Sequence, residues 1–561
     1  MKRLALKTSE RGARSSRSLW SASRRPAERN KFNIPGGSLS ATEVLGETPR
    51  TATGTVALPI PVAGRARWKS LAPFGQFSAG FVLATFALLA GCSVGPDYHR
   101  PDAIKNQNLP AAFTGEASTN AGVWKAAEPA ARLPHGAWWE IFGDADLNRL
   151  EALATAQNQT LAAAQAAFEQ ARAQVGVAKA DYYPQLTATP NAGRQRTSVN
   201  APDQGRPNGT SFTYNTFNVP VNLSWEIDLW GRVRRQTEGA RARFAAAADD
   251  LEAARLEIQA EVASDYFTLR ALDAERAIVA DTVETYRHSL ELTQNRRKGG
   301  VASDLDVSEA ETQLRAAEAQ LPALQLQRDE ILHAIATLAG QTATGFAIGT
   351  ANPWTNTIPA VPAGVPSELL ERRPDVAAAE RRMAAANADV GVAVNAFYPQ
   401  VTLTGAAGFQ SVGAGTLFQW PSRLWAIGPG VTLPLFTGGL NRAQLASARA
   451  AYDQSVANYR LTVLTAFQEV EDELAAEHLL AAQLDAQNAA LAAARRTLEI
   501  ANNRYKAGLV TYLEVAVAQS AALQNEQTAV ELQGQRLTAQ VALVRALGGG
   551  WQSGEVHVAS K

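Results

Sequence analysis

The chain has 561 residues, long enough for about three or four ordinary domains, and its 53 basic and 53 acidic residues cancel. This balance gives no sign of a nucleic-acid partner. The six histidines lie far apart, and the sequence contains no phosphate-loop, dinucleotide-loop or zinc-protease pattern. We therefore expect no catalytic centre, no metal and no cofactor, and we predict that the chain is not an enzyme.

The first 64 residues differ in composition from the rest of the chain. They are rich in Arg and Ser with scattered Pro and Gly, and such a composition cannot bury a hydrophobic core. The segment superficially resembles an organelle transit peptide, but residues 62–92 make a complete export signal by themselves. We predict that residues 1–64 are a disordered extension or an over-extended reading frame, with translation starting near Val62.

Residues 65–91 have the three parts of a lipoprotein signal peptide. Cations, an apolar stretch at 81–88 and small residues before the cut occur in the expected order. Leu89-Ala90-Gly91-Cys92 resembles the bacterial lipobox, in which the cysteine is acylated and becomes the mature first residue. The next residue is Ser93 rather than aspartate, which in such lipoproteins favours transfer to the outer membrane. Cys92 is the only cysteine, and a buried core position is the alternative.

The remainder of the chain repeats itself. The Gly-Val-Ala and Tyr-Pro-Gln motifs of 176–187 return with the same spacing at 391–402, and 295–301 is echoed by 503–509. Two matches at a similar offset indicate a tandem duplication. The predicted organisation is an extension (1–64), a lipoprotein signal peptide (65–91), an acylated linker (92–134), a first repeat (135–345), a linker (346–365), a second repeat (366–548) and a tail (549–561).

Each repeat contains one predicted β-hairpin. A helical stretch ends at the Tyr-Pro pair, because proline disfavours helix at the residue before it. Alternating, β-prone sequence follows, at 186–189 and 217–225 in the first repeat and at 401–404 and 431–435 in the second. Five aromatic residues lie near these strands, and they form either an interfacial belt or packing at a sheet–helix junction: Trp225, Trp230, Trp420, Trp425 and Phe436.

A very long helix follows each hairpin. Residues 231–298 and 438–506 contain no proline, and each run would extend roughly 100 Å. After a glycine turn we expect a return helix in each repeat, at 303–340 and 510–547, with Pro322 kinking or breaking the first. The acidic run 469–473 is predicted to be a solvated helix face.

The strand count restricts the oligomeric state. Exposed sheet edges cannot lie in hydrocarbon, so strands that span a bilayer must close into a barrel. The smallest such barrels have about eight strands, whereas this chain supplies four. Either several chains share one barrel, or the strands are not in a membrane. The lipobox cysteine favours the shared barrel.

The sequence as a whole resembles one known family. The lipobox, the paired Tyr-Pro-Gln repeats, the glycine turns and the run Glu371-Arg372-Arg373-Pro374-Asp375 carry the resemblance. Together they look like the outer-membrane factor of resistance–nodulation–division efflux systems, the lipoprotein branch of the TolC-like family, over essentially all of 92–550. The resemblance implies a mainly α-helical homotrimer in which three chains of four strands build a membrane β-barrel, continued by a long periplasmic α-helical barrel. An ordinary helix start would explain Pro374 but not the whole run.

The resemblance also assigns candidate site residues. In this family glycine turns form the periplasmic tip, where the tunnel narrows and the adaptor docks, here Gly299, Gly300 and Gly508. An acidic residue follows each turn at the same spacing, Asp306 and Glu514, and Tyr505 has the place of the family's gating tyrosine. Three copies of Glu514 would make an anionic ring at the aperture. The alternative for both acids is a helix N-terminal residue that stabilises the helix dipole, and the two roles can hold together.

The chain departs from the family at Val510 and Val517, where some relatives carry a basic residue and a second acid, so a salt-bridge latch of the best-known kind is not expected. The implied function is passive conduction of small toxic compounds across the outer membrane. The implied partners are a periplasmic adaptor protein, an inner-membrane pump and outer-membrane lipid. Rival interpretations are an envelope coiled-coil scaffolding lipoprotein, an efflux adaptor and a type I protein-secretion channel.

Overall fold

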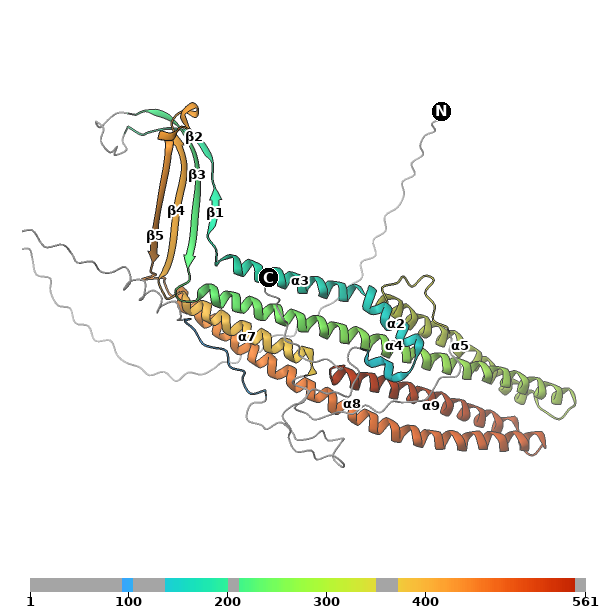
Figure 1. The fold of residues 1–561 in the computed structure, drawn as a ribbon. Coiled ribbons are helices and arrows are strands. Elements are labelled where there is room, and N and C mark those ends of the chain that lie inside the picture. Colours follow the sequence, from blue (N-terminus) through green and yellow to red (C-terminus); the bar gives the residue numbers. More distant parts are fainter. Residues whose placement is uncertain (1–92, 104–136, 200–210, 350–371, 550–561) are drawn as a thin grey trace, which may run out of the picture. The chain divides into compact units, whose positions relative to one another are not determined.

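A computed structural model describes residues 93–103, 137–199, 211–349 and 372–549, all within the compact unit Phe77–Lys561 (Figure 1). Several predictions fall on other residues. The extension 1–64, the signal peptide 65–91, the acylation site Cys92 and the motif residue Glu371 lie outside the described residues, as do most of the two linkers and of the tail.

The described strands form one antiparallel sheet. They are β1 Gln185–Ala188, β2 Asn191–Arg196, β3 Thr213–Ile227, β4 Gln400–Ser411 and β5 Arg423–Thr432. The order is β1-β3-β4-β5, and β2 also pairs with β3. β1 and β2 share one register on β3, because Ala188 lies opposite Val221 and Asn191 lies opposite Asn218. The first of the four predicted strands is therefore present but interrupted at Thr189-Pro190, where proline has no N–H to donate.

The prediction for the last strand was wrong in its bounds. We expected a strand at 431–435, but β5 begins at Arg423 and ends at Thr432, opposite Gln400. Beyond this pair Pro399 follows on the β4 side and Pro434 on the β5 side. Neither proline has a backbone N–H to donate, so the pairing ends there. The sequence analysis did not recognise this strand, because Gly428, Pro429 and Gly430 are residue types typical of turns.

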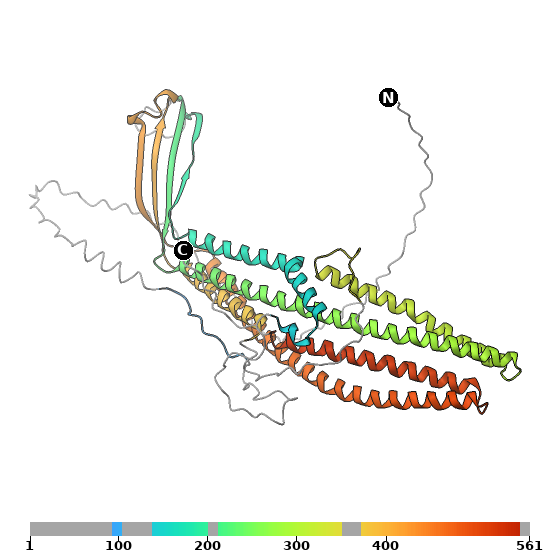
Figure 2. The same cartoon turned by 45° about the vertical axis from the view of Figure 1, so that its right-hand side comes forward.

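Both repeats have the same order of elements: a helix leading into the strands, then a long helix and a shorter return helix after them (Figure 2). In chain order the described helices are η2 Trp138–Phe142, α2 Ala145–Gln157, α3 Gln159–Ala180, α4 Arg232–Lys298, α5 Asp304–Leu338, α7 Pro374–Asn395, η3 Ala414–Thr416, η4 Trp420–Ser422, α8 Leu440–Lys506 and α9 Tyr512–Ala546. α4 and α8 have 67 residues each, so both are about 100 Å long. Each pairs with its return helix, α4 with α5 and α8 with α9.

The expected break at Pro322 does not occur. α5 runs without interruption from Asp304 to Leu338 with Pro322 inside it. A proline in a helix interior costs about 3 kcal/mol, which tertiary packing must offset. Leu321 and Leu324, on either side of it, pack against Val279 and Val283 of α4. Burial of this face thus keeps the helix continuous.

The largest hydrophobic cluster lies where η2 and α2 meet the middle of α4 and the C-terminal parts of α5 and α9. Its fully buried members include Trp138, Leu150, Tyr266, Ile335 and Val544. Within the described parts of the chain, no helix combines the length and hydropathy needed to cross a bilayer.

Candidate functional site

The sheet has two chemically different faces, because side chains alternate along each strand. In β3 the odd-numbered residues 217–227 are apolar, and the pairing places them beside apolar residues of the neighbouring strands. This apolar face comprises mainly Leu186, Ala188, Phe217, Val219, Val221, Leu223, Trp225, Ile227, Val401, Leu403, Phe409, Trp425, Ile427 and Val431. It is open to solvent in the single chain, where Trp425 is 79% exposed and Ile427 is 66% exposed.

The opposite face is polar and almost uncharged. Its members carry mainly amides and hydroxyls: Gln185, Thr187, Asn191, Asn218, Asn222, Ser224, Glu226, Gln400, Thr402, Thr404, Gln410 and Thr432. Amide and hydroxyl groups bond across strands, as Asn218 Nδ2 donates to Asn191 Oδ1 (3.0 Å) and Asn222 Nδ2 donates to Thr189 Oγ1 (3.1 Å). An apolar and a polar face on one antiparallel sheet are typical of a membrane barrel wall.

Two tryptophans fasten the sheet to the helices. Trp225 Nε1 donates to the Tyr182 carbonyl (3.0 Å), and Trp230 Nε1 donates to the Pro399 carbonyl (2.7 Å). Both acceptors belong to the repeated Tyr-Pro segments, and the Trp230 ring lies 5.4 Å from that of Tyr398. For Trp230 the packing alternative is therefore correct. Trp420 and Phe436 are exposed instead, with Phe436 at 91%.

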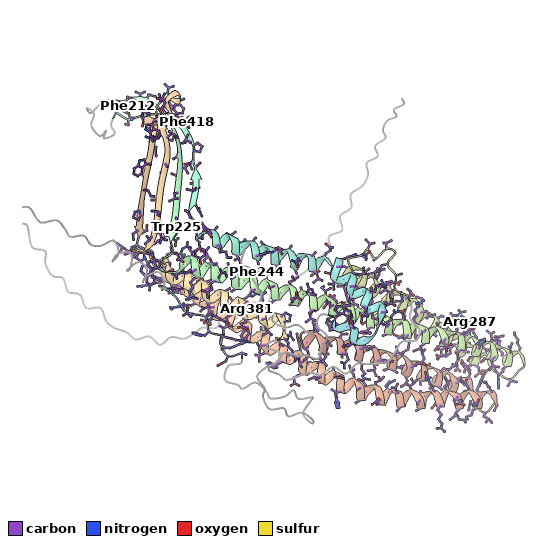
Figure 3. The ribbon with its side chains drawn as sticks, viewed as in Figure 1. Phe212, Trp225, Phe244, Arg287, Arg381 and Phe418 are labelled. Carbon is purple, nitrogen blue, oxygen red and sulfur yellow. The ribbon has the colours of Figure 1, made fainter. Side chains whose placement is uncertain are left out.

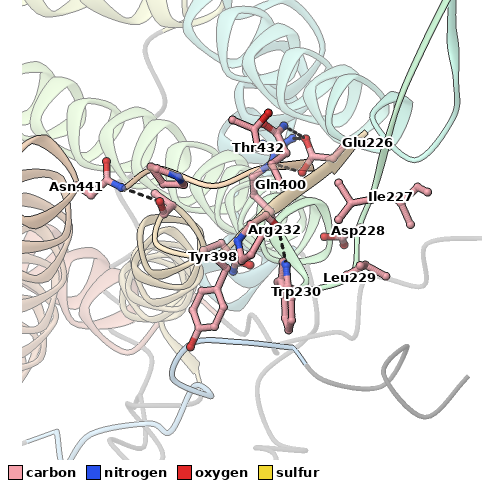
Figure 4. Close-up of a pocket in the computed structure, with 15 residues that line it drawn as sticks. Glu226, Ile227, Asp228, Leu229, Trp230, Arg232, Tyr398, Gln400, Thr432 and Asn441 are labelled. Carbon is pink, nitrogen blue, oxygen red and sulfur yellow. Dashed lines mark hydrogen bonds and ion pairs between the residues drawn. The ribbon is translucent and has the colours of Figure 1, made fainter. Parts of the chain in front are cut away.

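The junction also holds a cavity of about 290 Å³ that the sequence did not reveal (Figure 4). Glu226, the only acidic residue in the five strands, accepts two hydrogen bonds of 2.8 Å from the Arg232 guanidinium and one of 2.8 Å from Gln400 Nε2. Glu226 and Arg232 lie on opposite sides of Gly231, whose φ is +85°. An Asp or Glu six residues before an arginine is too common a pattern to be noticed in sequence alone.

The two predicted glycine turns have the same backbone. Gly300 and Gly508 have φ values of +73° and +75°. Val301 N donates to the Arg296 carbonyl (2.9 Å), and Leu509 N donates to the Arg504 carbonyl (3.0 Å). These are the bonds of a Schellman helix end, with glycine in the left-handed position. Gly299, with φ −79°, lies in the same turn but takes an ordinary conformation.

Asp306 links the two turns. Its carboxylate accepts hydrogen bonds from Ser303 N and Ser303 Oγ (both 2.8 Å), while Ser303 Oγ accepts from Asp306 N, which forms a capping box at the start of α5. Its other oxygen accepts from Tyr512 N (3.1 Å), the first residue of α9. Desolvation raises the pKa of Asp306, but these bonds outweigh it and hold the pKa below its usual range. Asp306 is thus a helix N-terminal acid whose hydrogen bonds serve the starts of α5 and α9.

Tyr505 is buried between the two helical hairpins rather than exposed. Its hydroxyl donates to Thr293 Oγ1 (3.3 Å), and its ring packs edge-on against Tyr512 at 5.5 Å. The guanidinium of Arg296 lies 4.6 Å from the Tyr505 ring, and Arg296 Nη1 donates to the Lys506 carbonyl (3.2 Å). Arg296 and Thr293, which the sequence analysis did not single out, therefore connect the end of α4 to the end of α8.

Glu514 differs from Asp306 despite its equivalent place. Its side chain is 52% exposed, and its nearest ionic partner is Arg504 Nη1 at 3.4 Å. It lines a groove of about 530 Å³ on one side of α9, while Leu513 and Val517 also line a second groove of about 420 Å³ on the other side. Apolar side chains around both turns are exposed, among them Val301, Leu305 and Leu509.

The described part of the diagnostic motif forms an ion cluster around the buried Arg373. Pro374 is the first residue of α7. Arg373 donates two hydrogen bonds to Asp375 (3.0 and 2.7 Å), one to Glu469 of α8 (2.6 Å) and one to the carbonyl of Ala546 in α9 (3.1 Å). The arginine joins three helices, so the motif has a structural role. Glu469, part of the acidic run predicted to be a solvated helix face, is 34% exposed while it accepts the bond from Arg373.

Comparisons with known proteins agree with this architecture. The family model described as outer membrane efflux protein matches residues 150–341 and 365–549. The chain is 34% identical to outer membrane protein OprJ of Pseudomonas aeruginosa, over 83% of this chain and 94% of the relative. It is 33% identical to toluene efflux pump outer membrane protein TtgC of Pseudomonas putida, over 84% and 96%. The solved structure of the outer-membrane channel OprN matches with a TM-score of 0.73 and 31% identity, over 82% of this chain and 100% of that chain.

Proposed function

The chain belongs to the outer membrane efflux protein family, and from this premise we propose that it is the outer-membrane channel subunit of a tripartite efflux system. In this role it passively conducts small toxic compounds from an inner-membrane pump and a periplasmic adaptor to the exterior. The observation that supports the proposal most directly is the two-faced sheet, whose apolar face suits lipid and whose amide-rich face suits a water-filled lumen.

The same sheet favours a trimer. Within the described residues, β1 and β2 form one edge and β5 forms the other. An edge in hydrocarbon leaves backbone groups without partners, so β5 of one copy should pair with β1 and β2 of the next. This contact is heterologous, and three copies close it into a ring. Twelve strands fall within the known range of membrane barrels.

A lipid anchor at Cys92 agrees with the position of the residues that follow it. Val94 N donates to the Trp230 carbonyl (3.0 Å) at the sheet–helix junction. Asp97 pairs with the buried Arg235 of α4 (2.7 Å). The chain just after Cys92 is therefore held beside the base of the sheet, at the level where acyl chains would enter the periplasmic leaflet.

The two glycine turns are the proposed periplasmic tip. Exposed apolar side chains at Val301, Leu305 and Leu509 offer an adaptor protein a contact surface. The link from Asp306 to Tyr512 and the buried Tyr505 hold the two hairpins of one chain together. Opening of this tip would require these contacts to separate, while Glu514 lies exposed beside them.

Paired variants of β5 test the proposal. Ile427 lies on the apolar face and Ala426 on the polar face, so adjacent residues probe lipid and lumen. Arginine on a lipid-facing strand costs about 2–4 kcal/mol at the bilayer midplane. We expect Ile427→Arg to abolish heat-resistant trimers, and Ala426→Arg to retain them with lower single-channel conductance. Equal behaviour of the two variants, or no conductance from the unaltered protein in lipid bilayers, would contradict the channel.

A further inference from the structure

The charged residues of the sheet are distributed unevenly. The five strands contain three basic residues, Arg194, Arg196 and Arg423, and one acidic residue, Glu226. The odd-numbered residues of β3 and β4 belong to the apolar face. The three arginines lie on this face too, because they pair with the odd-numbered residues Asn215 (Arg194), Thr213 (Arg196) and Phe409 (Arg423). Glu226 lies on the polar face, at the other end of the sheet, and is already paired with Arg232. No carboxylate of the strands is available to these arginines.

All three arginines lie at the end of the sheet away from the helices. Arg196 is the last residue of β2 and Arg423 is the first of β5. Phe212 and Phe418 mark this end and Trp225 marks the end beside the helices in Figure 3. From Trp225 to Asn215, the partner of Arg194, β3 advances ten residues, and a strand of about 9–11 residues spans the hydrocarbon. Arg194 and Arg196 therefore lie at the outer end of the apolar face, where the hydrocarbon-spanning part of the strand ends.

Local contacts turn two of these side chains toward the rim. Arg196 Nη2 donates to Ser211 Oγ (3.2 Å), and Arg423 Nε donates to the Trp420 carbonyl (2.9 Å). Trp420 and Phe418 are themselves 74% and 70% exposed. Cations and aromatic rings that share a rim face the polar headgroup zone of a membrane, since both combine an apolar part with a polar end.

We propose that Arg194, Arg196 and Arg423 form a binding surface for the phosphate groups of anionic lipid headgroups in the outer leaflet. The proposal rests on the proposed function, which makes the apolar face the lipid-facing wall. Guanidinium groups match phosphate oxygens with paired hydrogen bonds. The opposite end of the same face has no basic residue in the strands. In a trimer, nine such arginines surround the barrel.

Native mass spectrometry of the purified trimer with a phosphorylated glycolipid tests this. The test variant is Arg194→Ala/Arg196→Ala/Arg423→Ala. Its partner with three lysines keeps the charge, and Arg172→Ala/Arg315→Ala/Arg496→Ala removes three arginines from the helices. We expect lipid binding to fall about fivefold for each arginine removed from the rim. The lysine variant should lose less, and the helix variant should bind as the unaltered protein does.

Three outcomes would overturn the proposal: undiminished binding by the rim alanine variant, equal binding of the same lipid without its phosphates, or complete competition by inorganic phosphate. Single-channel conductance of the same preparations separates this proposal from the channel itself. The rim alanine variant should still conduct as a trimer, whereas an unaltered protein that does not conduct would contradict the proposed function instead.

Discussion

The two ends of α9 are held in different ways. At its C-terminal end, the buried Arg373 joins the Ala546 carbonyl to Asp375 and Glu469, and Leu543 and Val544 are fully buried. At its N-terminal end, α9 donates one backbone hydrogen bond to the first repeat, from Tyr512 N to the carboxylate of Asp306, and Tyr512 and Val515 are buried in a smaller hydrophobic cluster. Because the cluster at this end is smaller than the one at the C-terminal end, α9 should open locally at its N-terminal end more readily than at its C-terminal end. The difference therefore favours opening at the tip.

The two tip turns show how the duplication has diverged. Both turns end a helix with the same glycine geometry at Gly300 and Gly508. At the start of α5, Ser303 makes a capping box, whereas at the start of α9 the side chain of Thr511 makes no cap bond. The second repeat instead uses Asp306 of the first. A cap shared between repeats couples them, which a capping box within each repeat would not do.

A large effect is expected at the C-terminal end of α9. Arg373→Ala removes a buried arginine and leaves Glu469 and Asp375 without it. Because these carboxylates are 34% and 39% exposed, we expect a cost of about 2–4 kcal/mol, below that of breaking a fully buried pair. We expect a large fall in the midpoint temperature of trimer dissociation. Arg496→Ala, an exposed arginine of α8, is the control and should change little. Equal effects of the two variants would show that the Arg373 cluster does not hold the C-terminal end of α9.

Substitution of one glycine at each end of α9 allows the two ends to be compared directly. Both have left-handed φ values, +90° at Gly548 and +75° at Gly508. A Cβ on Gly548 would lie 2.2 Å from the Arg372 carbonyl oxygen, whereas one on Gly508 would meet only Arg296 Nη2 at 3.9 Å. Gly508→Ala should cost about 1–2 kcal/mol from the backbone alone, and Gly548→Ala about 1–3 kcal/mol more from overlap. Thermal unfolding of the two variants measures the difference, and the reverse order would contradict the comparison.

Asp306→Ala should weaken the attachment of the N-terminal end of α9 to the first repeat. It removes both the capping box and the bond from Tyr512 N, and we expect a local loss of about 1–3 kcal/mol. Hydrogen exchange at residues 508–516 should accelerate, and channel openings should become more frequent. Asp304→Ala is the matched control, because Asp304 is also in the first turn of α5 but pairs with Arg297 at the surface. A similar acceleration in both variants would indicate a helix-dipole effect alone.

Acid should imitate the loss of Asp306. Its pKa is lowered in the folded protein, so its stabilising contribution is present above the ordinary aspartate value of about 3.9 and disappears as pH falls through the lower folded value. The protection factor of the Tyr512 amide, corrected for intrinsic exchange, should stay constant from neutral pH to about 5 and fall only below about 4. In Asp306→Asn this acid step should be absent.

The elements that follow from local rules were predictable from the sequence. Proline-free runs and glycine turns predicted α4, α8 and their return helices within a few residues. Of the kink or break expected at Pro322 the break does not occur, and the limits of β5 were predicted wrongly, because the packing of Leu321 and Leu324 and the pairing with β4 are tertiary effects. The tip residues could be placed by spacing, but the bond from Tyr512 to Asp306 joins residues 206 apart, and no local pattern predicts it.

The smallest expected effect separates Glu514 from Asp306. Glu514 is exposed and touches only Arg504 among the described ionic groups, so Glu514→Gln should leave trimer stability within about 0.5 kcal/mol. If its three copies surround the aperture, their loss should lower the cation-to-anion permeability ratio in lipid bilayers by about fivefold or less, since each exposed charge contributes on the order of 1 kcal/mol. Arg504→Gln breaks the same ion pair from the other side and should raise the ratio. Because both variants remove the contact but differ in charge, a shift of the same sign in both would assign the effect to the broken pair and contradict the anionic ring.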